Sequence, residues 1–289
     1  MGNIIRLQGH EKFSLRDGWI AKAFKNIDVS SDGEYSDVFL RKDSPDVFGI
    51  GNNMVKSLRY WLKAFGFSEE KSGVGVRLTP IGNTIKKYDP YFEDVFSVWV
   101  AHSMISSNFE EATTWYLFFN SFDVVDFKKD ILFNSLNAEL SKYVEKFSAK
   151  SLQNDIDVLL NMYSKDKEVI DPEDKNQSPF SQLGLVKYKD GEYAKDHPDK
   201  RIINEWNVMF ELLKKYHRGD SVSISELTEG EQSIASIYQI SSTYINELLD
   251  RLDSREFIRV NRTAGLDMVY IETDMMSEDV LEEYYKNHR

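Results

Sequence analysis

Three basic residues of one predicted helix are the strongest candidates for contact with an acidic partner. Lys56, Arg59 and Lys63 are spaced three and four residues apart, so a helix places them on one face. Ammonium and guanidinium groups are donors that proteins use to bind nucleic-acid phosphates. Donors for phosphates or base edges also occur nearby, at Asn52, Asn53 and Arg77. These residues predict a surface for duplex DNA, and the alternative is a solvated basic face without a partner.

The charge of this region differs from that of the whole chain. The formal net charge is −12, which argues against a general nucleic-acid coat protein, because nonspecific affinity comes largely from phosphate neutralisation. From Gly51 to Lys87, seven basic residues stand against two acidic ones, a local balance of +5. Such segregation indicates a surface that meets a partner.

A group of carboxylates offers a second kind of chemistry. Asp89, Glu93 and Asp94 are clustered, and carboxylates that hold Mg²⁺ can support cleavage of a phosphodiester. They are therefore candidate catalytic residues, with Mg²⁺ as the cofactor if the protein nicks DNA. Capping of a helix N-terminus explains the same acids more simply.

The adjacent pair His10 and Glu11 is a further catalytic candidate. The pair belongs either to a hydrolytic site or to a polar network that orients the first helix, and we favour the network. His102 follows Trp99 on an apolar helix, which is typical of a core histidine.

Several classes of protein are excluded or disfavoured. The chain has no cysteine, so a disulfide, a thiolate zinc site and a cysteine nucleophile are excluded. No phosphate-binding glycine motif, Gly-x-Ser-x-Gly elbow or His-Glu-x-x-His motif occurs. No apolar run is long enough to span a bilayer, so we expect no membrane partner and a cytoplasmic location.

The basic residues need a helix and a ribbon to position them. Apolar residues recur at helical spacing over 52–65, Gly66 follows as a left-handed cap, and residues 74–78 alternate like a short strand. A helix over 37–41 and a turn at Thr79-Pro80 are also predicted. A helix followed by a β-ribbon is typical of the end of a winged helix-turn-helix, which places its helix in the major groove.

The pattern recurs along the chain and predicts an α+β fold. We expect a mainly α protein with small β-ribbons, in which multiple winged helix-turn-helix units surround a helical hub. The predicted parts are a winged-helix unit at 1–88, a helical hub at 89–126, a second winged-helix-like unit at 127–200 and a C-terminal winged-helix unit at 201–289. Loops are predicted at 30–33 and 164–178, and a helix over 131–147.

The last unit is less suited to DNA. Its predicted recognition helix, 241–252, carries Glu247 and Asp250, which would repel phosphate. Ser225 is the predicted cap of the preceding helix. The weaker DNA candidates in this unit are Ser242, Thr243, Asn246 and Arg262. This unit therefore either binds protein or only stabilises the fold.

Five segments in order carry a family resemblance. They are GHEKFSLRDGW, FGIGNNMVKSLRYWLKAFG, LTPIGN, DPYFEDVFSVWVAH and WYLFFN. The match covers roughly residues 9–195 and resembles a bacterial family called domain of unknown function 4007, in which lysine-asparagine is usual at positions 52–53. A member of that family is described as a DNA-nicking protein of single-strand DNA phosphorothioation and phage-defence systems.

The resemblance implies a function and partners. It implies DNA binding, and nicking that lets sulfur replace a phosphate oxygen, together with a cysteine desulfurase, a sulfur transferase and an ATPase. The family offers no catalytic motif to transfer to this chain, so we favour a DNA-binding component over a nuclease. The alternatives are a non-enzymatic winged-helix transcription regulator and a protein-binding scaffold of the same system.

Overall fold

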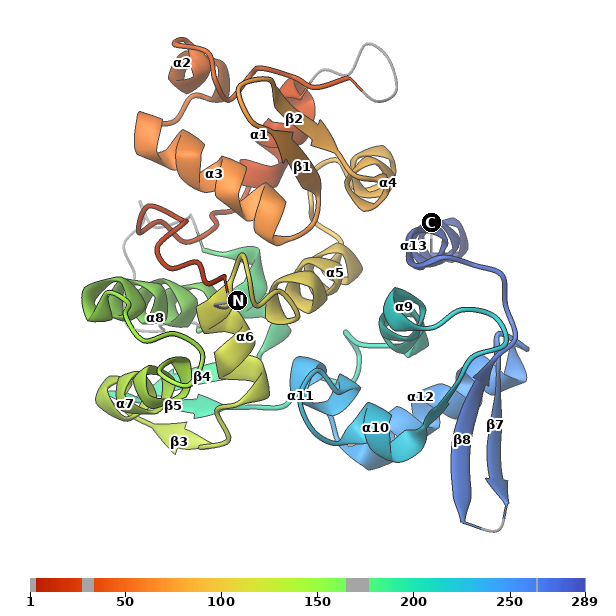
Figure 1. Cartoon of the computed structure of the whole chain (residues 1–289). Coiled ribbons are helices and arrows are strands. Elements are labelled where there is room, and N and C mark those ends of the chain that lie inside the picture. The colour runs from red at the N-terminus through yellow and green to blue at the C-terminus, as the bar shows by residue number, and fades with distance from the viewer. Residues whose placement is uncertain (1–3, 28–33, 165–176, 264, 289) are drawn as a thin grey trace. The chain divides into compact units, whose positions relative to one another are not determined.

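The computed structural model describes residues 4–27, 34–164, 177–263 and 265–288 (Figure 1). The loops predicted at 30–33 and over most of 164–178 lie outside these ranges. The described residues form helices and small antiparallel sheets, which confirms the α+β class. The chain divides into compact units at 1–196 and 197–289. No helix within the described ranges has the length and apolar character needed to cross a bilayer.

The first unit begins with three helices and a hairpin. They are α1 (Trp19–Asn26), α2 (Ser44–Phe48), α3 (Asn52–Ala64), β1 (Ser68–Lys71) and β2 (Gly75–Leu78). Helix α3 lies beside the hairpin (Figure 1). Gly66 has φ 65° and its N–H bonds Lys63 O, which confirms the predicted cap.

The helix predicted at 37–41 is wrong, because the helix forms instead at α2. Pro45 occupies the first turn of α2, where its missing N–H is not needed. The segment before α2 approaches the hairpin, because Ser36 pairs with Val76 as an antiparallel bridge. At Gly75, with φ 149°, an added Cβ would lie 2.0 Å from Ser36 O.

Thr79-Pro80 begins a helix, so the predicted turn there is also wrong. Helix α4 (Pro80–Tyr88) starts with Pro80 in its first turn, and the Thr79 hydroxyl accepts a hydrogen bond from Gly82 N. A side chain at Gly82 would meet the backbone, because an added Cβ would lie 2.1 Å from Phe67 O. Glycine therefore lets α4 pack directly on the chain that follows α3.

Aromatic helices form the core of this unit. Helices α5 (Val95–Ser106) and α6 (Thr113–Asn120) are buried along almost their whole length, as expected for helices that are apolar on every face. Trp61 of α3, Trp99 of α5 and Trp115 of α6 have no exposed surface. The core thus reaches from α3 through α5 and α6.

The rest of the described first unit contains two α-helices, a 3-10 helix and a small sheet. Its elements are β3 (Asp126–Phe127), α7 (Lys129–Leu140), α8 (Ala149–Tyr163), the 3-10 helix η1 (Pro179–Leu183), β4 (Val186–Lys189) and β5 (Glu192–Lys195). The sheet order is β3-β5-β4. The helix predicted over 131–147 is too long, because α7 ends at Leu140, whose carbonyl accepts the N–H groups of Tyr143 and Val144.

The second unit has the same kinds of element. They are α9 (Glu205–Lys215), β6 (Ser221–Ser223), α10 (Ile224–Thr228), α11 (Ile234–Tyr238), α12 (Ser242–Ser254), β7 (Ile258–Thr263), β8 (Leu266–Ile271) and α13 (Ser277–Asn287). The predicted cap at Ser225 is wrong, because Ser223 is the N-cap of α10 and its hydroxyl accepts the N–H of Glu226. The sheet order is β6-β8-β7.

One chain order occurs three times. In each case a helix leads to a short extended segment, then to further helices and a hairpin, and the early segment pairs with the second hairpin strand. The segments and their partners are Ser36 with β2, β3 with β5, and β6 with β8. The α-helices that precede the hairpins are α3, α8 and α12, and the 3-10 helix η1 stands between α8 and β4.

Candidate nucleic-acid interface

Helix α3 has one exposed face and one buried face. Asn52, Asn53 and Lys56 are exposed, while Arg59 and Lys63 are half-buried at the rim. The opposite face holds the predicted apolar residues, which are all buried: Val55, Leu58, Trp61 and Leu62. Burial of that face fixes the orientation of α3 about its axis. The polar residues at 52, 53, 56, 59 and 63 therefore point away from the core. We call them the α3 face.

The N-terminus of α3 lacks a side-chain cap. Gly51 is the N-cap in extended conformation, and it has no side chain that could accept from the first N–H groups. Such groups attract anions, because they carry the positive end of the helix dipole. Lys56 Nζ lies 3.4 Å from Asn53 Oδ1 and has no carboxylate partner within the described ranges. The exposed part of the α3 face therefore combines free donors with one free positive charge.

Arg59 is paired with a carboxylate on the hairpin. Its Nε and one terminal nitrogen donate to Glu70 Oε1 and Oε2 at 2.7 and 3.2 Å. This two-point contact fixes the guanidinium plane beside β1. Arg59 thus lies on the α3 face with its charge partly neutralised.

Lys63 shares a carboxylate with Arg6. Glu111 forms an ion pair with Lys63, and its Oε2 lies 2.6 Å from an Arg6 terminal nitrogen. The Arg6 guanidinium also lies over the Tyr60 ring, 5.3 Å from its centroid. The sequence does not indicate that Arg6, Glu70 and Glu111 belong to this site, because no regular spacing joins them to α3.

Arg77 lies on the other face of the hairpin. It forms an ion pair with Glu69, its partner in the strand register, and lies over the Tyr35 ring at 5.0 Å. Glu69 and Glu70 are neighbours in β1, and successive strand side chains point to opposite faces. The structure therefore brings together Asn52, Asn53, Lys56, Arg59 and Lys63, but separates Arg77 from them.

His10 lies inside a buried polar network. Lys12 N donates to its Nδ1 at 3.1 Å, which leaves Nε2 as the donor to Asp155 Oδ1 at 2.9 Å. Asp155 also accepts from Gln8 N and from the Thr114 hydroxyl, at 2.7 and 2.8 Å. The His10 side chain has no exposed surface. This geometry supports the network interpretation, and Glu11 lies beside it with φ 49°.

The acids at 89, 93 and 94 do not converge on one point. Asp89 accepts hydrogen bonds from Glu93 N, Asp94 N and the Ser97 hydroxyl, at 2.9, 3.1 and 2.5 Å. Asp94 caps α5 by accepting from Phe96 N, while Glu93 is exposed. In the described part of the chain, no group of three or more His, Cys, Asp or Glu residues could hold a metal ion. These residues therefore fit a Mg²⁺ site poorly.

In the second unit, the candidate residue Arg262 of the β7–β8 hairpin is bound to helix α12. Arg262 of β7 donates to Asp250 Oδ1 and Asn246 Oδ1 of α12, at 2.6 and 2.9 Å. The remaining candidates, Ser242 and Thr243, are exposed at the start of α12. This face of α12 thus carries acids, and one of them neutralises Arg262 of the neighbouring strand.

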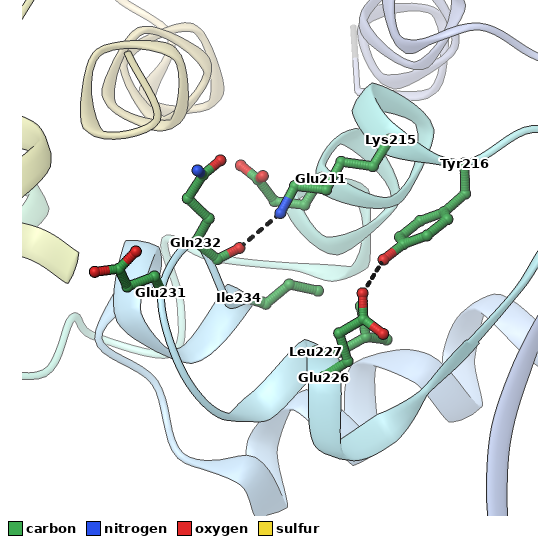
Figure 2. Close-up of a pocket in the computed structure, with 8 residues that line it drawn as sticks. All are labelled: Glu211, Lys215, Tyr216, Glu226, Leu227, Glu231, Gln232 and Ile234. Atoms are coloured by element: carbon green, nitrogen blue, oxygen red, sulfur yellow. Dashed lines mark hydrogen bonds between the residues drawn. The ribbon is translucent and has the colours of Figure 1, made fainter. Parts of the chain in front are cut away.

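The second unit also has a small polar pocket of about 70 Å³. Lys215 Nζ donates to Gln232 O at 2.9 Å, and the Tyr216 hydroxyl donates to Glu226 Oε1 at 2.8 Å (Figure 2). Burial lowers the pKa of Lys215, and burial together with Glu226 raises the pKa of Tyr216 to about 12. These bonds connect the end of α9 to α10 and to the loop before α11.

Fold and surface together define an α+β protein that presents a partly neutralised basic helix face. The chain belongs to the DUF4007 family, because the family model described as "Protein of unknown function (DUF4007)" matches residues 7–285. This match confirms the resemblance seen in the sequence segments.

Two solved structures have a similar fold. They are described as "Magnesium ion-bound SspB crystal structure" and "SspB crystal structure", with TM-scores of 0.86 and 0.85. Each is 21% identical to this chain, and the match covers 97% of this chain and 88% of the other. The likeness shows an SspB-like fold. Among curated proteins, none matches the chain significantly.

Proposed function

We propose that this protein is the DNA-binding component of a bacterial DNA phosphorothioation and anti-phage defence system. Its membership of the DUF4007 family and its SspB-like fold support the link to that system. Within it, α3 acts as a recognition helix on duplex DNA and the β1–β2 hairpin acts as a wing. The sulfur transferase and the ATPase of the system are its proposed protein partners.

The chain order supports a winged-helix mode of binding. A winged helix-turn-helix places its last helix in the major groove, and the β-ribbon that follows contacts the backbone. Here α3 directly precedes β1 and β2, and Ser36 joins Val76 of β2 through a single antiparallel bridge. We infer three such units, in which α3, α8 and α12 are the equivalent helices.

The observation that carries the proposal is the alignment of Lys56, Arg59 and Lys63 on the outer face of α3. The core fixes the helix from the other side, so the cations are presented together. The uncapped N-terminus adds backbone donors for a phosphate. Asn52 and Asn53 in the first turn offer amides for base edges.

A charge-reversal experiment tests this proposal. We expect Lys56→Glu with Arg59→Glu to abolish a salt-sensitive mobility shift of duplex DNA, because two phosphate contacts become repulsive. The matched control is Lys142→Glu with Lys146→Glu, which makes the same charge change at exposed positions after α7. An unchanged shift in the α3 variant, or an equal loss in the control, would contradict the proposal.

Nicking of DNA is a more specific prediction than DNA binding, and a separate experiment tests it. Supercoiled plasmid is incubated with the protein across a series of Mg²⁺ concentrations and in a chelator. Opening that requires Mg²⁺ and is lost in the Asp89→Ala/Glu93→Ala/Asp94→Ala variant would support the nickase. Absent or metal-independent opening would remove those acids from the candidates.

The second unit favours a protein partner over DNA. Arg262 is already bound by Asp250, and Glu247 adds a further exposed acid to α12. Titration calorimetry of the intact chain against the ATPase and the sulfur transferase tests this, with Glu247→Lys/Asp250→Lys as the variant expected to lose binding. Specific binding to the protein's own promoter without cleavage would favour the regulator instead.

A further inference from the structure

We propose that Glu70 and Glu111 tune the DNA affinity of the α3 face, because they compete with phosphate for Arg59 and Lys63. This inference rests on the proposed function and names a means by which the same surface is regulated. Neither acid contacts DNA in this scheme, so both are positioning residues. Their effect is to hold the cations in place and to weaken nonspecific binding.

The ion pairs Arg59–Glu70 and Lys63–Glu111 are both partly buried. The side chains of Arg59 and Glu70 are 28% and 21% exposed, and those of Lys63 and Glu111 are 31% and 22% exposed. Salt screens such half-buried pairs less than fully exposed ones. A phosphate that approaches either cation therefore meets a carboxylate already bound to it.

The acids are held in place by their backbones. Glu70 is paired with Val76 in the β1–β2 register. Glu111 O accepts a hydrogen bond from the Tyr60 hydroxyl of α3 at 2.9 Å, and Glu111 N donates to Asn108 Oδ1 at 3.0 Å. Neither backbone is free to swing away when DNA arrives. The carboxylates thus remain beside the cations as fixed negative charges.

The two ion pairs determine the net charge of the α3 face. Four cations lie on or beside the α3 face: Arg6, Lys56, Arg59 and Lys63. Two of these charges are offset by Glu70 and Glu111. Lys56 alone among the four has no carboxylate partner within the described ranges. The surface therefore presents a net charge of about +2 instead of +4, which limits the counterion release that drives nonspecific binding.

The experiment measures the affinity for a duplex oligonucleotide over a range of salt concentrations. We expect Glu70→Gln and Glu111→Gln each to tighten binding roughly threefold to tenfold. Each should also steepen the slope of log K against log salt by about 0.9, because one more cation becomes available to phosphate. Circular dichroism and thermal unfolding of the same samples confirm that the variants are folded.

Two controls separate this mechanism from a general charge effect. Glu69→Gln removes the same charge from the neighbouring residue, whose side chain lies on the other face of the hairpin with Arg77, so we expect less than half the gain. In an Arg59→Gln background, Glu70→Gln should give almost no gain. Equal gains from Glu69→Gln and Glu70→Gln, or a full gain without Arg59, would overturn the inference.

The remaining outcomes distinguish the inference from the proposed function. If the wild-type protein shows no salt-dependent binding, the proposed function fails and this inference fails with it. If the wild-type protein binds and the Lys56→Glu/Arg59→Glu variant does not, the proposed function stands. In that case, unchanged affinity and slope in both Glu→Gln variants would overturn the inference alone.

Discussion

The rings of His10 and Trp61 stack nearly parallel, with centroids 5.6 Å apart and planes inclined by 9°. Trp61 belongs to the buried face of α3, and its Nε1 donates to Phe13 O at 3.1 Å. Ser57 of the same helix donates to that carbonyl at 3.2 Å. The N-terminal segment therefore supports α3 from behind the face that carries Lys56, Arg59 and Lys63.

The network that holds His10 should contribute strongly to stability. Asp155→Ala would leave His10, Gln8 N and Thr114 without their buried acceptor, so we expect a loss of roughly 3–5 kcal/mol in the free energy of unfolding, because each unsatisfied buried donor costs about 1–3 kcal/mol. Asp155→Asn should cost less, because its amide still accepts from His10 and donates to Thr114. Urea unfolding of both variants checks this, and equal losses would show that the hydrogen bonds are not responsible.

Gly82 should not tolerate alanine although it lies in a helix. Helix propensity alone favours alanine over glycine by about 1 kcal/mol. The added Cβ would lie 2.1 Å from Phe67 O, and relieving such overpacking costs roughly 1–3 kcal/mol. We therefore expect Gly82→Ala to lower the Tm, whereas Asn83→Ala, at the next and exposed position, should not. A higher Tm for Gly82→Ala would contradict the packing of α4.

Lys195 should make stability rise with pH in a defined window. Its ammonium group donates to Phe118 O at 2.7 Å and to Phe122 O, and burial lowers the pKa of Lys195 to about 8. Between pH 8 and the ordinary lysine pKa of about 10.5, the unfolded chain binds more protons than the folded one, so the free energy of unfolding increases.

A variant that lacks only this lysine provides the reference for that measurement. The difference between wild type and Lys195→Met cancels the titration of most other groups. We expect the wild type to gain stability relative to Lys195→Met as the pH rises from 8 to 10, as measured by urea unfolding. A difference that stays constant or falls would contradict the lowered pKa.

Thermal unfolding can also test Mg²⁺ at Asp89. Three hydrogen bonds already occupy this carboxylate, so Asp89→Asn should lower the Tm equally in Mg²⁺ and in Na⁺ at the same ionic strength. A ligand that binds only the folded state raises the Tm. A rise specific to Mg²⁺ in the wild type that is absent in Asp89→Asn would support the predicted metal site.

Local patterns predicted much of the fold. The apolar spacing of α3, the position of Gly66 and the aromatic runs of α5 and α6 all depend on neighbours along the chain. Proline was the main source of error, because Pro80 begins a helix where a turn is predicted, and the helix predicted over 37–41 forms instead with Pro45 in its first turn. The family resemblance came from segments that include α3 itself.

The contacts that shape the candidate site could not be predicted in this way. His10 and Asp155 are 145 residues apart in sequence, and Lys63 meets Glu111 only because the loop before α6 folds against α3. The pairing of Arg59 with Glu70 depends on which face of β1 each acid occupies. Helical spacing predicted which cations share a face of α3, whereas the tertiary structure determines which carboxylates pair with them.

The two adjacent acids of β1 have a consequence for how the hairpin is aligned. A slip of one residue that put Glu69 in the place of Glu70 would put Ser68 in the place of Glu69, so Arg77 would lose its carboxylate. A slip in the other direction would put Lys71 in the place of Glu70, beside Arg59. The observed alignment also buries Val76 fully and places Gly75, where only a hydrogen fits, beside Ser36 O. Charged and uncharged residues of the hairpin therefore select the same alignment.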